Sequence, residues 1–365
     1  MERRAAFAAS EEELQVRELA HEFAAGELRP HVEAWDRERT IPAPVLGQLA
    51  ELGFLGMAIP EEHGGMGFDA PTFAAAVEEL AWGEASVATL VARHAAAADL
   101  ILRLGTEEQR ARWLPAMARG ETLAALAHWD SDDDAPATVE REGDALVLRG
   151  VLAHVVRSPS TGLIVARVQM AGGASGGVLV PADVPGVSVR ERHAPLGLRP
   201  LEVVTAALDD VRLGPDAELA GAAADPGAGD IGRLGAAAVA AGVARAALEH
   251  AVAYAGVRQQ FRRLIREFEG MQFKLADMAM RTAGAAALVR HAAAAPGAQA
   301  TALAKVGASE AAMWVATQAV QVFGGYGYMR DYPVEKLMRD AKATEILGGL
   351  NQALRRLIAR ELYRA

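Results

Sequence analysis

Apolar residues recur at helical spacing along the first third of the chain. Leu14, Leu19 and Phe23 form a stripe behind Ser10, which is placed to cap a helix ahead of three glutamates. The segment Thr106–Gln109 has the pattern of a capping box and predicts a further helix start. We therefore expect residues 1–121 to form an N-terminal helical domain, with helices over 45–52, 73–82, 87–104 and 107–118.

From about residue 122 the pattern changes to short β-rich runs punctuated by Gly, Pro and Asp. These runs cover 145–151, 162–168, 177–180, 187–190 and 201–211. Because no helical stretch lies between them, they favour an antiparallel barrel or sandwich over a parallel βαβ sheet. We expect a β middle domain over residues 122–220.

Small residues over 221–229 predict a linker, and long helical patterns follow it. Four stretches, 230–259, 267–294, about 297–323 and 333–363, have lengths typical of a four-helix bundle. Residues 221–365 are therefore expected to form a C-terminal four-helix bundle. The predicted fold class is α+β, with helices, then a β middle domain, then helices.

Composition changes this picture mainly by exclusion. The 365-residue chain has a net charge of -10, so it lacks the basic field of a general nucleic-acid binder. It contains no cysteine, which excludes disulfides, thiolate metal sites and a cysteine nucleophile. Its longest wholly apolar stretch, 234–244, is far short of a membrane span of about 20 residues, and the first ten residues lead into no signal-like apolar core. We expect a cytoplasmic protein with no membrane span and no nucleic-acid partner.

Several short motifs look chemical, but their contexts argue against that interpretation. Asp130–Asp134 spaces its carboxylates like a calcium loop, yet Ala135 and Arg141 stand where that loop needs Gly and Glu. Gly173–Gly177 has the pattern G-x-S-x-G, but a strand rather than a helix is predicted after it, which indicates a hairpin. The histidines lack metal-site spacing, and neither a G-x-G-x-x-G motif nor a P-loop occurs. No metal is therefore expected, and any nucleotide must bind in another way.

Longer blocks carry a resemblance to a known family. They are Tyr254–Phe261, Phe268–Ala279, Ala319–Tyr328, Asp331–Lys342 and Ile358–Leu362, with agreeing loops upstream at Pro60–Gly67, Leu104–Gln109 and Leu196–Arg199. In these blocks the chain resembles the acyl-CoA dehydrogenase family over nearly its whole length. The resemblance implies the same helix–sheet–helix architecture, and it implies FAD bound between subunits.

The resemblance also implies which residues hold the flavin nucleotide. Arg258 matches an arginine that meets the diphosphate, a role suited to a guanidinium fork, and Phe261 matches an aromatic residue beside the adenine half. Gly324 and Gly325 would let backbone N–H groups approach a phosphate closely. The remaining matches are two amides that contact the AMP portion and two positions that face the flavin ring: Gln321, Gln352, His128 and Val156.

The family's catalytic base is missing at both of its usual positions. Removal of an α-proton from an acyl thioester needs a carboxylate, and the two matching residues here are Gly348 and Gly232. Gly232 precedes Arg233, which is expected near the substrate. Gly348 keeps a backbone N–H that can still polarise a thioester carbonyl, as the resemblance implies for that position.

Other acids offer possible substitutes for the missing base. Glu345 lies one turn before Gly348, and Asp230 precedes Gly232 by two residues. Glu78 and Glu79 match acids near the floor of the family's acyl pocket, where they either shape that pocket, with Glu79 at the substrate, or join a network between helices.

The resemblance and the missing base leave three functions open. The first is an FAD-dependent oxidoreductase acting on an acyl thioester with a displaced or substrate-supplied base. The second is a non-catalytic partner subunit of a heteromeric acyl-CoA dehydrogenase. The third is an oxygenase-like or redox-neutral flavoenzyme in which His128 and His154 take a new role. The expected partners are a CoA or carrier-protein thioester, an electron-transfer partner or oxygen, and further chains in a homodimer, a homotetramer or a heteromer with a catalytic paralogue.

Overall fold

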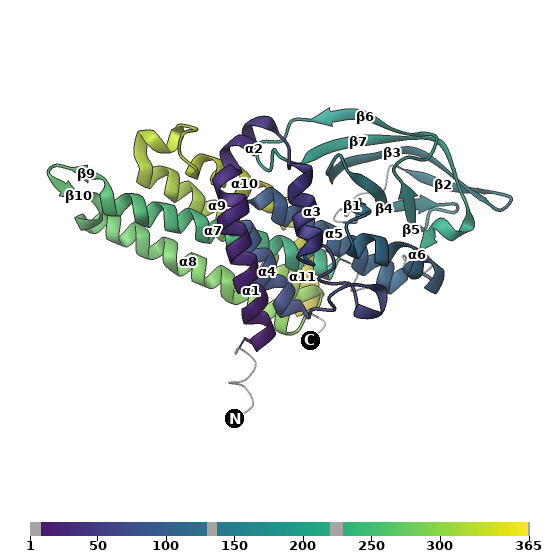
Figure 1. The fold of residues 1–365 in the computed structure, drawn as a ribbon, viewed down its shortest axis with the longest axis horizontal. Coiled ribbons are helices and arrows are strands. Elements are labelled where there is room, and N and C mark those ends of the chain that lie inside the picture. The colour runs from purple at the N-terminus through teal and green to yellow at the C-terminus, as the bar shows by residue number, and fades with distance from the viewer. Residues whose placement is uncertain (1–8, 130–136, 220–228, 364–365) are drawn as a thin grey trace, which may run out of the picture.

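The computed structural model describes residues 9–129, 137–219 and 229–363. The acidic run Asp130–Asp134 and all but the last residue of the predicted linker lie outside these ranges. A helical part, a sheet and a second helical part follow one another along the chain (Figure 1), which confirms the predicted α+β architecture.

Among the described N-terminal residues, 9–129, there are six α-helices. The predicted caps are present, since the Ser10 side chain accepts a hydrogen bond from the Glu13 N–H, and Thr106 and Gln109 form both bonds of a capping box. Helix α5 is buried along most of its length, so it lies at the centre of the molecule. The helices are α1 (Glu11–Phe23), α2 (Val32–Glu38), α3 (Ala43–Glu51), α4 (Ala70–Gly83), α5 (Ala85–Leu104) and α6 (Glu107–Ala118).

The middle part forms one eight-stranded sheet in the order β6-β7-β3-β2-β4-β5-β8, with β1 beside β4. Most pairs are antiparallel, but β1 and β2 both run parallel to β4, and within the described residues the sheet does not close into a barrel. Strand β1 was not predicted because Leu-Ala-Ala-Leu-Ala is buried on both faces and shows no alternation. The strands are β1 (Leu123–Ala127), β2 (Thr138–Glu142), β3 (Ala145–Arg157), β4 (Thr161–Met170), β5 (Ser175–Pro181), β6 (Val187–His193), β7 (Glu202–Leu213) and β8 (Glu218–Leu219). As predicted, the G-x-S-x-G segment lies in a hairpin: Gly173 and Ala174 belong to the turn after β4, and Ser175–Gly177 begin β5.

The C-terminal part contains five α-helices rather than four. The prediction of one helix over 333–363 is wrong, because Gly348 and Gly349 have φ angles of +73° and +103°, which no right-handed helix can contain. A hairpin of two short strands, β9 (Gln259–Gln260) and β10 (Arg263–Leu264), follows the first of these helices. The helices are α7 (Asp230–Val257), α8 (Glu269–Ala294), α9 (Ala298–Phe323), α10 (Val334–Thr344) and α11 (Asn351–Leu362).

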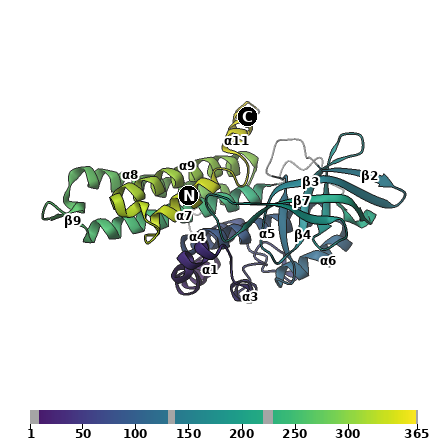
Figure 2. The ribbon, with the colours of Figure 1, turned by 90° about the horizontal axis from the view of Figure 1, so that it is seen from above.

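The molecule is elongated, with the sheet at one end and the β9–β10 hairpin at the other (Figures 1 and 2). Alanine-rich α7 is buried over most of its length, and its small residues allow close contact: a Cβ atom at Gly242 would lie 2.3 Å from the Glu78 carbonyl oxygen. Helices α5 and α7 are long and apolar enough to cross a membrane, but 83% and 67% of their apolar windows are buried in the molecule, as expected of core helices.

Candidate functional site

The two glycines that are predicted to occupy the family's base positions meet in space. Gly232 lies in the first turn of α7, and Gly348 lies in the loop between α10 and α11. A Cβ atom built at Gly348 would be 3.2 Å from the Gly232 carbonyl oxygen. Both glycines line a cavity of about 20 Å³, room for about one water molecule. The rest of its wall comes from Thr89, Ala92, Arg93, Leu126, Ala236, Val239, Thr344 and Leu347.

No carboxylate belongs to the described wall of this cavity, and Arg93 is its one ionisable residue. A side chain at Gly348 does not fit the backbone as folded. Its φ angle is left-handed, and a Cβ atom there would lie 2.7 Å from the Cβ of Ala236. The backbone at Gly348 is therefore shaped for glycine and leaves no space for a side chain.

A second small cavity, of about 10 Å³, lies between α5 and the sheet. We call the two cavities and their walls the junction site. The wall of the second cavity includes Val156, the residue expected beside the flavin ring, together with Leu123, Thr161 and Arg93. Arg93 thus borders both cavities. Sequence analysis did not single it out, although a charged residue within the otherwise apolar run of α5 was a signal that could have done so.

The nearby acids are held by other residues. Glu345 is 2.5 Å from the Lys342 ammonium group, and Asp230 accepts a hydrogen bond from Thr301 at 3.0 Å and pairs with Arg233. Arg233 also donates from Nε to Thr301 at 3.1 Å. None of these residues lines the cavity. The Arg233 Cα would lie 3.5 Å from a Cβ atom at Gly348, but the Arg233 side chain is held by Asp230 and Thr301.

Glu79 belongs to a network between helices. Its carboxylate accepts from Arg17 at 2.8 Å and from Arg245 at 2.9 Å, and it lies 2.9 Å from His21 Nδ1. Burial alone would raise the pKa of Glu79, but the hydrogen bonds from Arg245 and Arg17 outweigh it and hold that pKa below its ordinary value. Burial raises the pKa of neighbouring Glu78. The network alternative for Glu79 is the one that the structure bears out.

His128 and His154 both have left-handed backbone conformations, with φ angles of +61° and +53°. His128 follows β1, and its Nε2 accepts the Ala153 N–H at 3.1 Å. His154 lies at an irregularity in the pairing of β3 with β7, and its ring centroid is 5.0 Å from that of His193. Both histidines therefore shape strand β3 next to Val156.

Five of the residues expected to hold the cofactor lie at the far end of the bundle. Arg258 ends α7, and its guanidinium lies 5.3 Å from the Tyr326 ring centroid. Phe261, in the hairpin, is 88% exposed. Gly324 ends α9 with φ +60° and ψ -134°, and nothing lies within 4 Å of a Cβ built there or at Gly325. Exposed Gln321 is one turn before Gly324, whereas exposed Gln352 lies on α11, just after the loop that holds Gly348.

These two groups of residues lie far apart within one chain. Gly232 and Arg258 are on the same straight helix, and at 1.5 Å per residue they are about 39 Å apart. Figure 1 shows the hairpin and the sheet at opposite ends of the molecule. The two groups therefore lie at opposite ends of α7.

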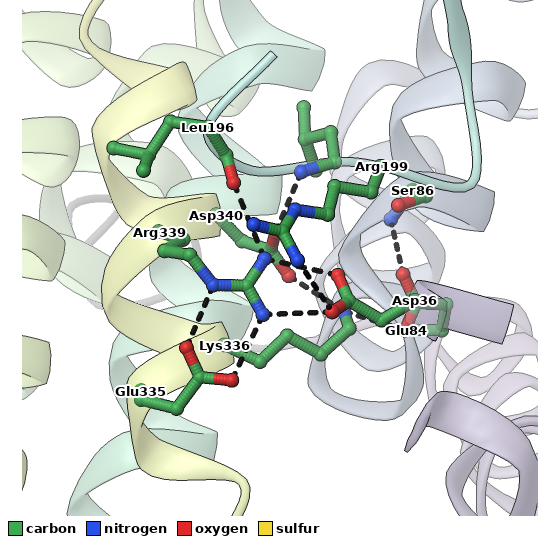
Figure 3. Close-up of polar contacts among 10 residues, drawn as sticks. Asp36, Glu84, Ser86, Leu196, Arg199, Glu335, Lys336, Arg339 and Asp340 are labelled. Atoms are coloured by element: carbon green, nitrogen blue, oxygen red, sulfur yellow. Dashed lines mark hydrogen bonds and ion pairs between the residues drawn. The ribbon is translucent and has the colours of Figure 1, made fainter. Parts of the chain in front are cut away.

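A buried charged cluster positions α10 and the glycine loop that follows it (Figure 3). Arg339 pairs with Asp36 of α2 at 2.8 Å and with Glu335, while Lys336 lies 2.8 Å from Glu84 and 2.6 Å from Asp340. Asp340 also accepts the Leu198 N–H, from the β6–β7 loop, at 2.6 Å. The cluster therefore joins all three parts of the molecule.

The charges in this cluster compensate one another. Burial alone would lower the pKa of Lys336, but the charges of Asp340 and Glu84 raise it well above the ordinary value. A cavity of about 560 Å³ lies beside the cluster, lined among others by Arg29, Trp82 and Arg330. The wall of this cavity contains both cations and carboxylates, so its charge favours neither anionic nor cationic ligands.

The fold and the junction site define a class of protein. The same helix–sheet–helix arrangement occurs in butyryl-CoA dehydrogenase from Megasphaera elsdenii, which is 29% identical with a TM-score of 0.92 and covers 98% of this chain and 99% of that one. A glutaryl-CoA dehydrogenase from Mycobacterium smegmatis, solved in complex with FADH2, is 25% identical with a TM-score of 0.90, over 98% of this chain and 96% of that one.

The chain belongs to the acyl-CoA dehydrogenase family. Residues 10–121 match the model "Acyl-CoA dehydrogenase, N-terminal domain", and residues 221–363 match "Acyl-CoA dehydrogenase, C-terminal domain". An acyl-CoA dehydrogenase of Bacillus subtilis (strain 168) is 35% identical over 97% of this chain and 98% of its own length. An acryloyl-CoA reductase (NADH) of Anaerotignum propionicum is 34% identical over 98% and 96%.

Proposed function

We propose that this chain is an FAD-dependent oxidoreductase that acts on an acyl thioester of CoA or of a carrier protein, and that none of its own carboxylates removes the α-proton. The observation that carries the proposal is the pair of facing glycines, Gly232 and Gly348, in a cavity whose described wall holds no carboxylate. The nearby acids Glu345 and Asp230 are held in ion pairs elsewhere. The base is then supplied by the substrate.

The residues at the end of the bundle fit a flavin dinucleotide. The Arg258 guanidinium suits a diphosphate, and the open backbone at Gly324 and Gly325 suits a close approach to phosphate oxygens. FAD supplies the hydride acceptor. The chain itself contributes the Gly348 backbone N–H, which polarises the thioester carbonyl, and the packed walls of α5 and α7, which exclude water from the reacting atoms.

The site is proposed to be completed by a second chain. Because Arg258 lies about 39 Å along α7 from Gly232, its partner at the flavin is the junction site of another copy. We propose a homodimer or homotetramer that passes electrons to a separate electron-transfer protein or to oxygen.

The test is to purify the protein alone and to measure its absorption spectrum and its mass in solution. We expect a yellow oligomer with about one FAD per chain. Arg258→Ala should lose most of the FAD without unfolding, whereas the control Arg290→Ala, an exposed arginine on α8, should keep it. A colourless protein that takes up no added FAD, or an Arg258→Ala variant that stays fully loaded, would contradict the proposal.

A second candidate is a non-catalytic partner subunit of a heteromeric enzyme. It is favoured by the small size of the cavity, about 20 Å³, together with the two glycines at the base positions. This candidate predicts that the chain alone binds no acyl thioester, and that it forms a stable flavin-loaded assembly only with a catalytic paralogue. A flavin-loaded homo-oligomer that binds thioesters would exclude it.

A further inference from the structure

The cavity between Gly232 and Gly348, which we call the glycine cavity, has two polar groups in its wall that find no hydrogen-bond partner in the described part of the chain. The first is the hydroxyl of Thr89 on α5: this residue is 4% exposed, and its Oγ1 atom is buried and unpaired. The second is the backbone N–H of buried Gly348, which meets no acceptor within residues 9–129, 137–219 and 229–363. Buried hydroxyl and N–H groups of native proteins are almost always paired, either with protein or with ordered water.

The glycine cavity has the size and the acceptors that a water molecule needs. Its volume of about 20 Å³ exceeds the roughly 10–15 Å³ that one water requires. The Gly232 carbonyl oxygen lies 3.2 Å from the place that a Cβ atom would take at Gly348. Thr344 also lines the cavity, and because its hydroxyl donates to the Ala341 carbonyl oxygen at 2.7 Å, its own oxygen can still accept. Two to four polar partners are what a buried water typically has.

We propose that the glycine cavity is a binding site for one water molecule, which accepts from the Gly348 N–H, bonds to the Thr89 hydroxyl and donates to the Gly232 carbonyl oxygen. The water joins α5, the start of α7 and the α10–α11 loop at a point where Gly348 has no side chain that could do so. The inference concerns the chain alone and depends on neither FAD nor a thioester. A thioester carbonyl that binds the Gly348 N–H must first replace this water.

A bound water and a dry cavity predict opposite effects for one substitution. Thr89→Val keeps the shape of the side chain and removes the hydroxyl. In a dry cavity it would remove an unpaired buried group, so it would leave stability unchanged or raise it. With a bound water it takes away one of the partners of that water, so it lowers stability.

Urea denaturation of the full chain measures this difference in sign. Thr89→Val should raise the equilibrium constant for unfolding about tenfold. The matched control is Thr72→Val in α4, because the Thr72 hydroxyl is also buried and unpaired within the described residues, yet Thr72 lines neither cavity of the junction site. The control should be neutral or stabilising. If Thr89→Val is as stable as the native chain, or if the two variants lose stability equally, the inference is wrong.

A crystal structure of the native protein tests the site directly, and it decides the matter even if Thr89→Val does not fold. We expect one water peak within hydrogen-bond distance of both Thr89 Oγ1 and the Gly348 nitrogen. The peak should remain in Thr89→Ser, which keeps the hydroxyl, and should be lost or displaced in Thr89→Val. A native cavity without this peak would overturn the inference. The proposed function would still stand, since its own test is the binding of flavin.

Discussion

Gly348 and Gly232 are not equivalent, although the sequence predicts that both take the place of a carboxylate in the family. Gly348 has a left-handed backbone, and Ala236 occupies the space beside it. Gly232 lies in the first turn of α7, where an acidic residue is favoured by the helix dipole. The chain is therefore adapted to a glycine at 348, whereas the start of α7 favours an acidic residue at 232.

Gly348→Ala should destabilise the protein. The left-handed conformation and the contact with the Ala236 Cβ together should cost about 2–4 kcal/mol of the free energy of unfolding. Gly284→Ala is the control: it lies in α8 with nothing within 4 Å of the added Cβ, and it should be neutral or stabilising by up to about 1 kcal/mol. Urea denaturation measures both. Equal stability of Gly348→Ala and the native chain would contradict the strain at this loop.

His94 should make stability depend on pH. Burial lowers its pKa from 6.5 to about 4, and its ring accepts the Ala124 N–H through Nδ1 while Nε2 contacts the Met117 carbonyl oxygen. The unfolded chain therefore binds more protons than the folded one between pH 6.5 and pH 4, so stability is lost as pH falls through this window.

The loss from His94 should be about 2 kcal/mol between pH 7.5 and pH 5. Burial and the Arg29 charge lower the pKa of His250 to about 4 as well, which adds to the effect in the same direction. Urea denaturation at the two pH values measures it. A free energy of unfolding that is flat over this range would show that the two histidines are not buried in their neutral form.

At the scale of elements, helix α10 is fixed by buried charges rather than by its own propensity. Lys336 balances Glu84 and Asp340, so replacing it leaves two buried carboxylates without their cation. Lys336→Met should therefore cost about 3–5 kcal/mol. The control Lys342→Met breaks an exposed pair with Glu345 on the same helix and should cost less than about 1 kcal/mol. A similar small cost for both, measured by urea denaturation, would contradict the role of the cluster.

The sequence predicted elements well where a local signal exists. The capping box at Thr106 marked α6 correctly, and the helical periodicity placed α5 and α7–α9. The prediction from sequence failed where the signal for an element is not local. Strand β1 shows no alternation because both of its faces are buried. The break between α10 and α11 was missed because Gly348 was considered only as an altered base position, and the Gly348-Gly349 pair was not read as the end of a helix.

At the scale of the whole molecule, the sequence could match residues to roles but could not show which of them meet. Gly232 and Gly348 are far apart in the chain and come together only through the packing of α7 against the α10–α11 loop. Arg233 and Glu345 are next to or near these glycines in sequence, yet their side chains are engaged elsewhere. Arg93 was identified as a candidate site residue only from the structure, because its side chain belongs to the walls of both cavities.

The separation of the nucleotide residues from the junction site is also a property of the whole chain. It follows from the length of α7, a straight helix of 28 residues with Gly232 near one end and Arg258 at the other. The account therefore predicts that flavin binding and self-association are lost together on dilution. Analytical ultracentrifugation with detection at the flavin wavelength measures this, and a monomer that retains its full flavin load would contradict it.

The central claim is that no carboxylate of this chain deprotonates the substrate. The most direct measurement is NMR-detected exchange of the α-protons of butyryl-CoA in D₂O, with FAD-loaded protein and a thioester concentration that saturates the site by calorimetry. The native chain should not accelerate exchange, whereas Gly232→Glu, which places a carboxylate in the cavity, should accelerate it by about 10²–10⁴-fold. Rapid exchange by the native chain, lost when one of its own acids is replaced, would contradict the account.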